Sequence, residues 1–172
     1  MKETKERGTV WLCITAMFMA INIVLSSFGV PVPGGRLYLN DIVICTAALI
    51  LDPMAAFIVG GVGAFIGDFL FYPAPMFVSL ITHGLQAIII SYFAHYAFKN
   101  TPILASVLGV VLGAIIMVVG YTLGRAFIYG TPEYAILKMP YQILQATIGA
   151  VISILLYWKC NLRQHFVQIL KK

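Results

Sequence analysis

The sequence predicts an all-α, polytopic membrane protein: a compact bundle of six transmembrane helices in a single domain over residues 1–172. Of its residues, 61% are hydrophobic and only 10% are charged, whereas a soluble domain has roughly 25% charged residues. The mean hydropathy is +0.96. Six apolar stretches also follow one another along the chain, and a bilayer crossing needs about 20 such residues.

Proline and glycine mark where the apolar stretches end. The first stretch stops at the Pro/Gly segment 29–35, which cannot continue a helix. The second ends at Asp52-Pro53, where a helix-start signal coincides with proline. Shorter segments containing proline separate the remaining stretches. The expected spans are therefore about 9–28, 40–52, 54–71, 76–98, 103–128 and 138–159.

Basic residues gather on one side of the predicted bundle. Six spans place both termini on the same side, and an excess of Lys and Arg there indicates that both termini are cytoplasmic. The membrane thus accounts for the net charge of +5, and nucleic acid is not an expected partner. The terminal side would hold Lys2, Lys5, Arg7, Lys99, Lys159, Arg163, Lys171 and Lys172, against Arg36 and Lys138 on the other, with Arg125 near the end of span five.

Strongly polar residues cluster in the outer halves of the spans. Each costs roughly 2.5–3.5 kcal/mol to bury in a membrane, so each needs a partner or a function. The asymmetry predicts a polar pocket that opens outward and is sealed toward the cytoplasm, and such a pocket suits a small, flat, hydrogen-bonding solute. Several of these residues share a helix face at i,i+3 or i,i+4 spacing. They are Asn40, Asp41, Asp68, His83, Gln86, Tyr121, Arg125, Tyr141, Gln142 and Gln145.

Each polar residue also has a purely structural interpretation. Asp68 and Arg125 could form an ion pair, and His83 could be a satisfied interhelical hydrogen-bonder. Asn40 and Asp41 stand where they could cap the second helix. Tyr72, Tyr129 and Tyr134 fit the aromatic belt of a membrane interface better than a binding site.

Other function classes have less support in the sequence. A His83–Asp68 dyad is the one arrangement that could serve an intramembrane enzyme, and we found no catalytic motif. An ion-coupled carrier would need a polar path through the cytoplasmic half, or two repeated halves with broken helices. Cys13, Cys45 and Cys160 are scattered, which predicts neither a disulfide nor a metal site. We expect no cofactor.

Small residues recur at four-residue spacing in most spans, which allows helix backbones to approach closely. Tight packing within the bundle is the expected role of four of the five pairs. The fifth, Ala16–Ala20, has a second interpretation that depends on a family resemblance. The pairs are Ala16–Ala20, Gly60–Ala64, Gly63–Gly67, Gly109–Gly113 and Gly120–Gly124.

Two stretches resemble the substrate-binding S component of energy-coupling factor (ECF) transporters, which are bacterial vitamin importers. Residues 38–68 are similar to the family's start of helix two, its turn before helix three, and a glycine-rich helix three ending in Gly67-Asp68. Residues 139–147, Met-Pro-Tyr-Gln-Ile-Leu-Gln-Ala-Thr, resemble the opening of helix six. The similarity covers nearly the whole chain, and the motifs are specific in this order and spacing.

The resemblance implies a subunit of the bacterial cell membrane that captures a vitamin from outside and releases it inward by toppling in the bilayer. ATP hydrolysis would belong to two partner ATPases. Ala16 and Ala20 would dock on the transmembrane T subunit of the ECF module. The site would lie among helices four to six, which favours His83, Gln86, Tyr121, Arg125, Tyr141, Gln142 and Gln145, together with Asp68, over Asn40 and Asp41.

The identity of the vitamin follows less directly from the resemblance. The Gly-Asp and tyrosine pattern is closest to the subgroup for hydroxymethylpyrimidine or pyridoxine-like compounds, which are small aromatic alcohols suited to amide contacts and stacking. Arg125, if it faces the pocket without a partner, would instead favour a carboxylate such as pantothenate.

Overall fold

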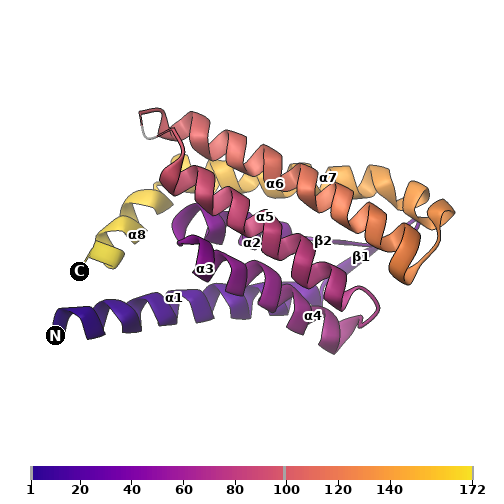
Figure 1. The fold of residues 1–172 in the computed structure, drawn as a ribbon, viewed down its shortest axis with the longest axis horizontal. Coiled ribbons are helices and arrows are strands. Elements are labelled where there is room, and N and C mark those ends of the chain that lie inside the picture. The colour runs from indigo at the N-terminus through magenta and orange to yellow at the C-terminus, as the bar shows by residue number, and fades with distance from the viewer. Residues whose placement is uncertain (1, 99, 172) are drawn as a thin grey trace.

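The computed structural model describes residues 2–98 and 100–171 and is a bundle of long helices (Figure 1). Within these residues, five helices are long and apolar enough to cross a membrane, and the predicted helical membrane bundle is confirmed. The second crossing is continuous but contains a π-helical turn, and the fourth ends in one. The crossings are α1 (Lys2–Ser26), α3–η1–α4 (Pro53–Phe57, Ile58–Val62, Gly63–Phe71), α5 (Met76–Tyr96), α6–η2 (Pro102–Gly124, Arg125–Tyr129) and α7 (Pro132–Trp158).

The second predicted span, 40–52, corresponds to a helix much shorter than the five crossings. Helix α2 (Asn40–Ile50) has 11 residues, so it is about 16 Å long, half the thickness of the hydrocarbon core. It packs against α1, α5 and α7, and nine of its residues are buried. Because the longer helices shield it from lipid, α2 can begin with the polar residues Asn40 and Asp41 in the interior of the bundle.

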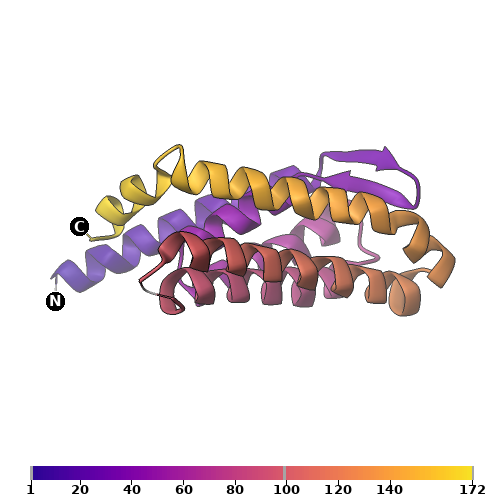
Figure 2. The same cartoon turned by 90° about the horizontal axis from the view of Figure 1, so that it is seen from above.

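A β-hairpin occupies the segment that the sequence predicted only as a Pro/Gly loop. Strands β1 (Gly29–Val32) and β2 (Gly35–Tyr38) pair antiparallel, with Gly29 opposite Tyr38 and Val32 opposite Gly35. The connecting turn is Pro33-Gly34, and Gly34 has φ +77°, as expected when proline precedes glycine in a tight turn. Figure 2 shows the hairpin beside α7, at the end of the molecule away from the termini.

Close helix packing by small residues is confirmed. A Cβ on Gly60 would lie 2.8 Å from the backbone oxygen of His83, and one on Gly113 would lie 2.6 Å from Ile90 Cγ1. A Cβ on Gly120 would meet Thr82 Oγ1 at 2.6 Å. Helix α5 therefore has the second crossing on one side and α6 on the other, each in direct contact.

Both termini lie at the end opposite the hairpin (Figure 1). The predicted helix start at Asp52-Pro53 is confirmed there: Asp52 Oδ1 accepts from the amides of Met54 (3.0 Å) and Ala55 (3.2 Å), and Trp11 Nε1 donates to Oδ2. After α7 the chain forms a short helix that we did not expect, α8 (Leu162–Lys171), whose Phe166 ring lies 5.7 Å from that of Phe18.

Two of the eight basic residues expected on the terminal side are found at this end, namely Lys159 at the end of α7 and Arg163 in α8. Lys99 and Lys172 lie outside the described residues, and the side chains of Lys2, Lys5, Arg7 and Lys171 are not described. The cytoplasmic orientation of the termini remains a prediction.

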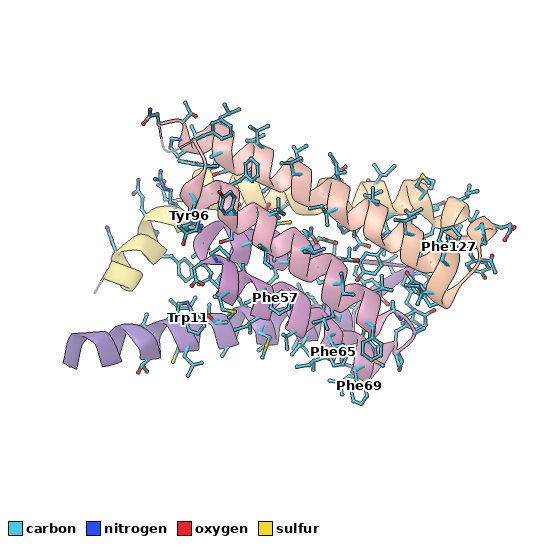
Figure 3. All side chains as sticks on the ribbon, in the orientation of Figure 1. Trp11, Phe57, Phe65, Phe69, Tyr96 and Phe127 are labelled. Carbon is cyan, nitrogen blue, oxygen red and sulfur yellow. The ribbon has the colours of Figure 1, made fainter. Side chains whose placement is uncertain are left out.

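The outside of the bundle is apolar. Phe69 and Phe127 stand on its periphery toward the hairpin end, and Tyr96 lies toward the other end (Figure 3). Their exposed fractions are 59%, 78% and 55%, which in a membrane means contact with lipid or its interface. The hydrophobic core lies toward the termini, where α2 and its neighbours extend to Trp11, Trp158 and Phe166; its fully buried members include Ile44, Leu49, Leu51, Val59, Ile90 and Val110.

Candidate functional site: a polar cavity beneath the hairpin

A cavity of about 500 Å³ lies at the hairpin end of the bundle, within the usual range of roughly 300–1,000 Å³ for small-molecule sites. Its walls come from the hairpin, the start of α2, and the hairpin-side ends of α1, α4, α5, α6 and α7. The lining is rich in tyrosines, amides and cations: its polar side chains are Ser26, Arg36, Tyr38, Asn40, Asp68, Tyr72, His83, Tyr121, Arg125, Tyr129, Thr131, Tyr134, Lys138, Gln142 and Gln145.

Six of the eight residues predicted for substrate binding line this cavity: Asp68, His83, Tyr121, Arg125, Gln142 and Gln145. Gln86 and Tyr141 do not. Gln86 is only 1% exposed and lies beneath the floor, where it supports the residues above it. Asn40, which the resemblance had set aside in favour of later helices, does line the cavity.

Helix α7 begins earlier than the sequence predicted. We expected the last span to start at 138, but the helix starts at Pro132 and continues through Pro140. Residues 134, 138, 142 and 145 then share one face at spacings of four, four and three, and all four line the cavity. Tyr141 does not line it. The same spacing would have identified Tyr134 and Lys138 from the sequence, had the helix start been placed correctly.

Beneath the cavity floor, Asp41 organises a hydrogen-bond network. Its Oδ1 accepts from Gln86 Nε2 at 3.1 Å and its Oδ2 from Gln145 Nε2 at 2.6 Å. The expectation that Asp41 caps α2 is wrong, because the N-cap is Leu39 and no side chain caps it. Asp41 is 1% exposed, so its carboxylate depends on these two amides for hydrogen bonds.

This network orients two residues of the cavity wall. Since Gln86 donates to Asp41, its Oε1 must face His83 Nδ1, 2.7 Å away. His83 therefore carries a hydrogen on Nδ1, which it donates to Gln86. On the other side, Gln145 Oε1 accepts from the Tyr38 backbone N–H at 3.0 Å. Strand β2 is thus tied through Gln145 to Asp41.

Asp68 belongs to a second hydrogen-bond chain. Tyr121 donates its hydroxyl to Ser79 Oγ at 2.5 Å, and Ser79 donates to Asp68. Among the described residues no ion pair joins Asp68 to Arg125, so the expected structural salt bridge is wrong. His83 is partnered by Gln86, with Asp41 3.9 Å away, and within the described residues no hydrogen bond joins it to Asp68. The geometry does not support the His83–Asp68 dyad of an enzyme.

Cations form another part of the cavity wall. Lys138 is 2% exposed, and its Nζ donates to the Arg36 backbone oxygen at 2.6 Å. Arg125 makes a long hydrogen bond of 3.4 Å to Gln142 Oε1, and its guanidinium lies 5.6 Å from the centre of the Tyr129 ring. The sequence placed Arg36 and Lys138 in outer loops and did not assign them to the site.

Tyrosines supply the aromatic surface of the cavity. Tyr72, Tyr129 and Tyr134, which we interpreted as interface aromatics, line it together with Tyr38 and Tyr121. Burial, reinforced by the nearby carboxylate of Asp68, raises the pKa of Tyr38, so its hydroxyl stays protonated. No group of three or more potential metal-ligating side chains occurs in the described part of the chain. The arrangement is suited to binding an aromatic solute through stacking and hydrogen bonds.

A separate surface feature lies on α1. Ala16 and Ala20 are both exposed, whereas the glycines at four-residue spacing, such as Gly60, Gly63 and Gly67, pack inside the bundle. Met17 and Ile21 beside them are 46% and 41% exposed. The Ala16–Ala20 strip is therefore not used for packing within this chain.

Comparison with known proteins gives consistent matches. The family model described as "ECF-type riboflavin transporter, S component" matches residues 8–162. A protein of Pyrococcus woesei, described as an uncharacterized protein in the gap 3′ region, is 32% identical over 136 residues, covering 78% of this chain and 89% of that one. A solved structure of the S component of a bacterial ECF transporter has the same fold, with a TM-score of 0.65 at 22% identity, covering 94% of this chain and 98% of that one. The chain belongs to the family of ECF-type riboflavin transporter S components.

Proposed function

We propose that this S component captures riboflavin in the cavity beneath the hairpin and passes it inward when coupled to an ECF module. As an S component it is a transporter subunit of the membrane and not an enzyme. The family it belongs to is named for riboflavin. The chemistry of the cavity agrees with a flavin, which has a flat ring system, an edge of alternating acceptors and donors, and a polar tail.

The observation that carries this proposal is the composition of the cavity wall. Tyr72, Tyr121 and Tyr129 offer ring faces, and aromatic rings favour offset or edge-on contact with a flat solute. Gln142 and Gln145 present amides that can both donate and accept. Asn40 adds a buried carbonyl oxygen without a hydrogen-bond partner in the described chain, and such a group is expected to meet a ligand donor.

Size distinguishes riboflavin from the vitamins suggested by the sequence. Hydroxymethylpyrimidine and pyridoxine each have a single six-membered ring, whereas a cavity of about 500 Å³ accommodates a fused ring system with a side chain. Polar groups also line the cavity on every side, more than a single small ring could contact. Pantothenate would use the cations but has no aromatic ring to use the tyrosines. We therefore place riboflavin first.

The closed core explains why partners are needed. Between the cavity and the termini lie fully buried apolar side chains such as Ile44, Leu49 and Val59. Release on the inner side then requires the whole subunit to reorient, in agreement with toppling. The exposed Ala16–Ala20 strip fits the docking surface for a T subunit, because two small residues one turn apart let a foreign helix cross closely.

Binding can be tested with purified protein in nanodiscs by quenching of flavin fluorescence. We expect submicromolar affinity for riboflavin without ATP, and no displacement by hydroxymethylpyrimidine, pyridoxine or pantothenate at equal concentration. Gln142→Leu should weaken binding about tenfold, the effect of losing one hydrogen bond worth roughly 1.4 kcal/mol. Gln164→Leu, the same change at an exposed position in α8, is the matched control. Tight binding of pyridoxine with none of riboflavin would contradict the proposal.

A further inference from the structure

We propose that the cavity contains an anion subsite, formed by Lys138 and Arg125 beneath the hairpin turn, which binds the phosphate monoester of a phosphorylated flavin. This inference rests on the proposed function and specifies which form of the flavin the site prefers. It begins from two cations that the cavity brings together and that nothing else in the described chain neutralises.

Lys138 is the stronger of the two observations. Its side chain is 2% exposed, yet its ammonium has three donors and the described chain supplies one acceptor, the Arg36 backbone oxygen at 2.6 Å. Lysine is almost never fully buried unless paired. Because Lys138 lines the cavity, its remaining donors can be satisfied by a bound solute.

Arg125 brings a second charge to the same place. A planar guanidinium has five donors, and here one of them makes a long contact of 3.4 Å with Gln142 Oε1. Its guanidinium also lies over the Tyr129 ring, 5.6 Å from the ring centre. Arginine in this state suits bidentate binding of a phosphate oxygen pair.

The hairpin turn brings the two cations together. A Cβ on Gly35 would lie 3.9 Å from Arg125 Nη2 and 3.9 Å from Lys138 Cε, so both side chains flank one glycine. At Gly34 the backbone is so close that a Cβ would lie 2.9 Å from the Lys138 backbone nitrogen. Arg36, on the same hairpin, adds a third cation to the lining.

No carboxylate balances these charges. Within the described residues, no acidic oxygen lies within 4.0 Å of Lys138 or Arg125. Asp68, the one carboxylate that lines the cavity, receives the Ser79 hydroxyl instead. Lys138 and Arg125 repel each other, and a dianion bound between them is attracted to both and offsets that repulsion. A phosphate ester fits this requirement, and a neutral flavin does not. Lys138 is only 2% exposed, which favours a solute inside the cavity over a lipid headgroup at its mouth.

Comparing riboflavin with riboflavin 5′-phosphate (FMN) tests the subsite directly. In nanodiscs of zwitterionic lipid, we expect FMN to bind at least tenfold more tightly than riboflavin, and the ratio to shrink in 0.5 M salt as charges are screened. Lys138→Gln and Arg125→Gln should each remove most of the preference, while Lys138→Arg keeps it. Lys159→Gln, an exposed lysine at the other end of the bundle, should leave the ratio unchanged.

The outcomes separate this inference from the proposed function. If riboflavin binds tightly and FMN binds no better, or if the preference survives in both glutamine variants, the subsite is wrong and the flavin proposal stands. If neither flavin binds, the flavin proposal is wrong, and pyridoxine against pyridoxine 5′-phosphate decides the subsite. A phosphate preference lost in Lys138→Gln then supports it, and no preference overturns it. Thermal unfolding of each variant identifies any that fail to fold.

Discussion

Replacing Gln145 with leucine tests whether the hairpin is held in place from beneath the cavity. Gln145 makes two hydrogen bonds in opposite directions, accepting from the Tyr38 backbone N–H at 3.0 Å and donating to Asp41 Oδ2 at 2.6 Å. Gln145→Leu removes both and leaves a side chain of similar size. The hairpin loses a tie to the network, and Asp41 keeps Gln86 as its remaining amide donor.

The two lost bonds have different expected effects. A hydrogen bond to a carboxylate is worth about 1.5–3 kcal/mol and one between neutral groups about 1 kcal/mol. We expect the free energy of unfolding to fall by roughly 2.5–4 kcal/mol, the sum of the two. Loosening of the hairpin corresponds to the neutral bond, so hydrogen exchange of the amides in residues 29–38 should accelerate about fivefold. Hydrogen–deuterium exchange with mass spectrometry measures this peptide by peptide.

Asp52→Asn provides the control for position. Asp52 caps α3 at the opposite end of the bundle, and asparagine is also a good N-cap, so hairpin exchange should not change. The reasoning would be refuted if Gln145→Leu left exchange of residues 29–38 at the wild-type rate while stability fell. That result would mean that strand β2 is held by contacts other than the one to Gln145.

Two further predictions concern the hairpin turn and α1. Gly34→Ala should speed hydrogen exchange of the hairpin amides at least fivefold, because φ +77° costs a non-glycine residue about 1–2 kcal/mol and the new Cβ would meet Lys138. Gly8→Ala, where a Cβ has nothing within 4 Å, is the control and should have no effect. Equal exchange rates in the two variants would contradict the role of the turn. Ala16→Trp with Ala20→Trp should abolish co-purification with a T subunit but spare flavin binding, measured by pull-down and fluorescence titration. Loss of binding as well would show that these alanines pack the bundle.

Much of the site could be predicted because polar residues in an apolar chain are conspicuous. Asp68, His83 and Arg125 stand out in their spans, since each would be costly in lipid without a partner or a function. The assignment was less accurate where it depended on helix boundaries. Placing the start of the last span at 138 instead of Pro132 put Lys138 in a loop, although it lines the cavity.

The role of Asp41 could not be deduced from the sequence. At the start of a helix, an aspartate is most simply interpreted as a cap, and the sequence offers no sign that Gln86 and Gln145, 45 and 104 positions away, donate to it. Such contacts depend on how α2, α5 and α7 are arranged in space. The same holds for Arg36, which reaches the cavity only because the Pro/Gly segment folds back as a hairpin.

Composition and hydropathy alone determined that the chain is a helical membrane bundle with its polar residues concentrated toward one end, because burial in lipid leaves few other solutions. Tertiary structure decided the rest. Helix α2 has only 11 residues, and it can be this short because the neighbouring helices shield it from lipid. The pairing of Asp41 with two amides, and the convergence of Lys138 and Arg125 beneath Gly35, depend on contacts between distant segments, which local sequence patterns do not encode.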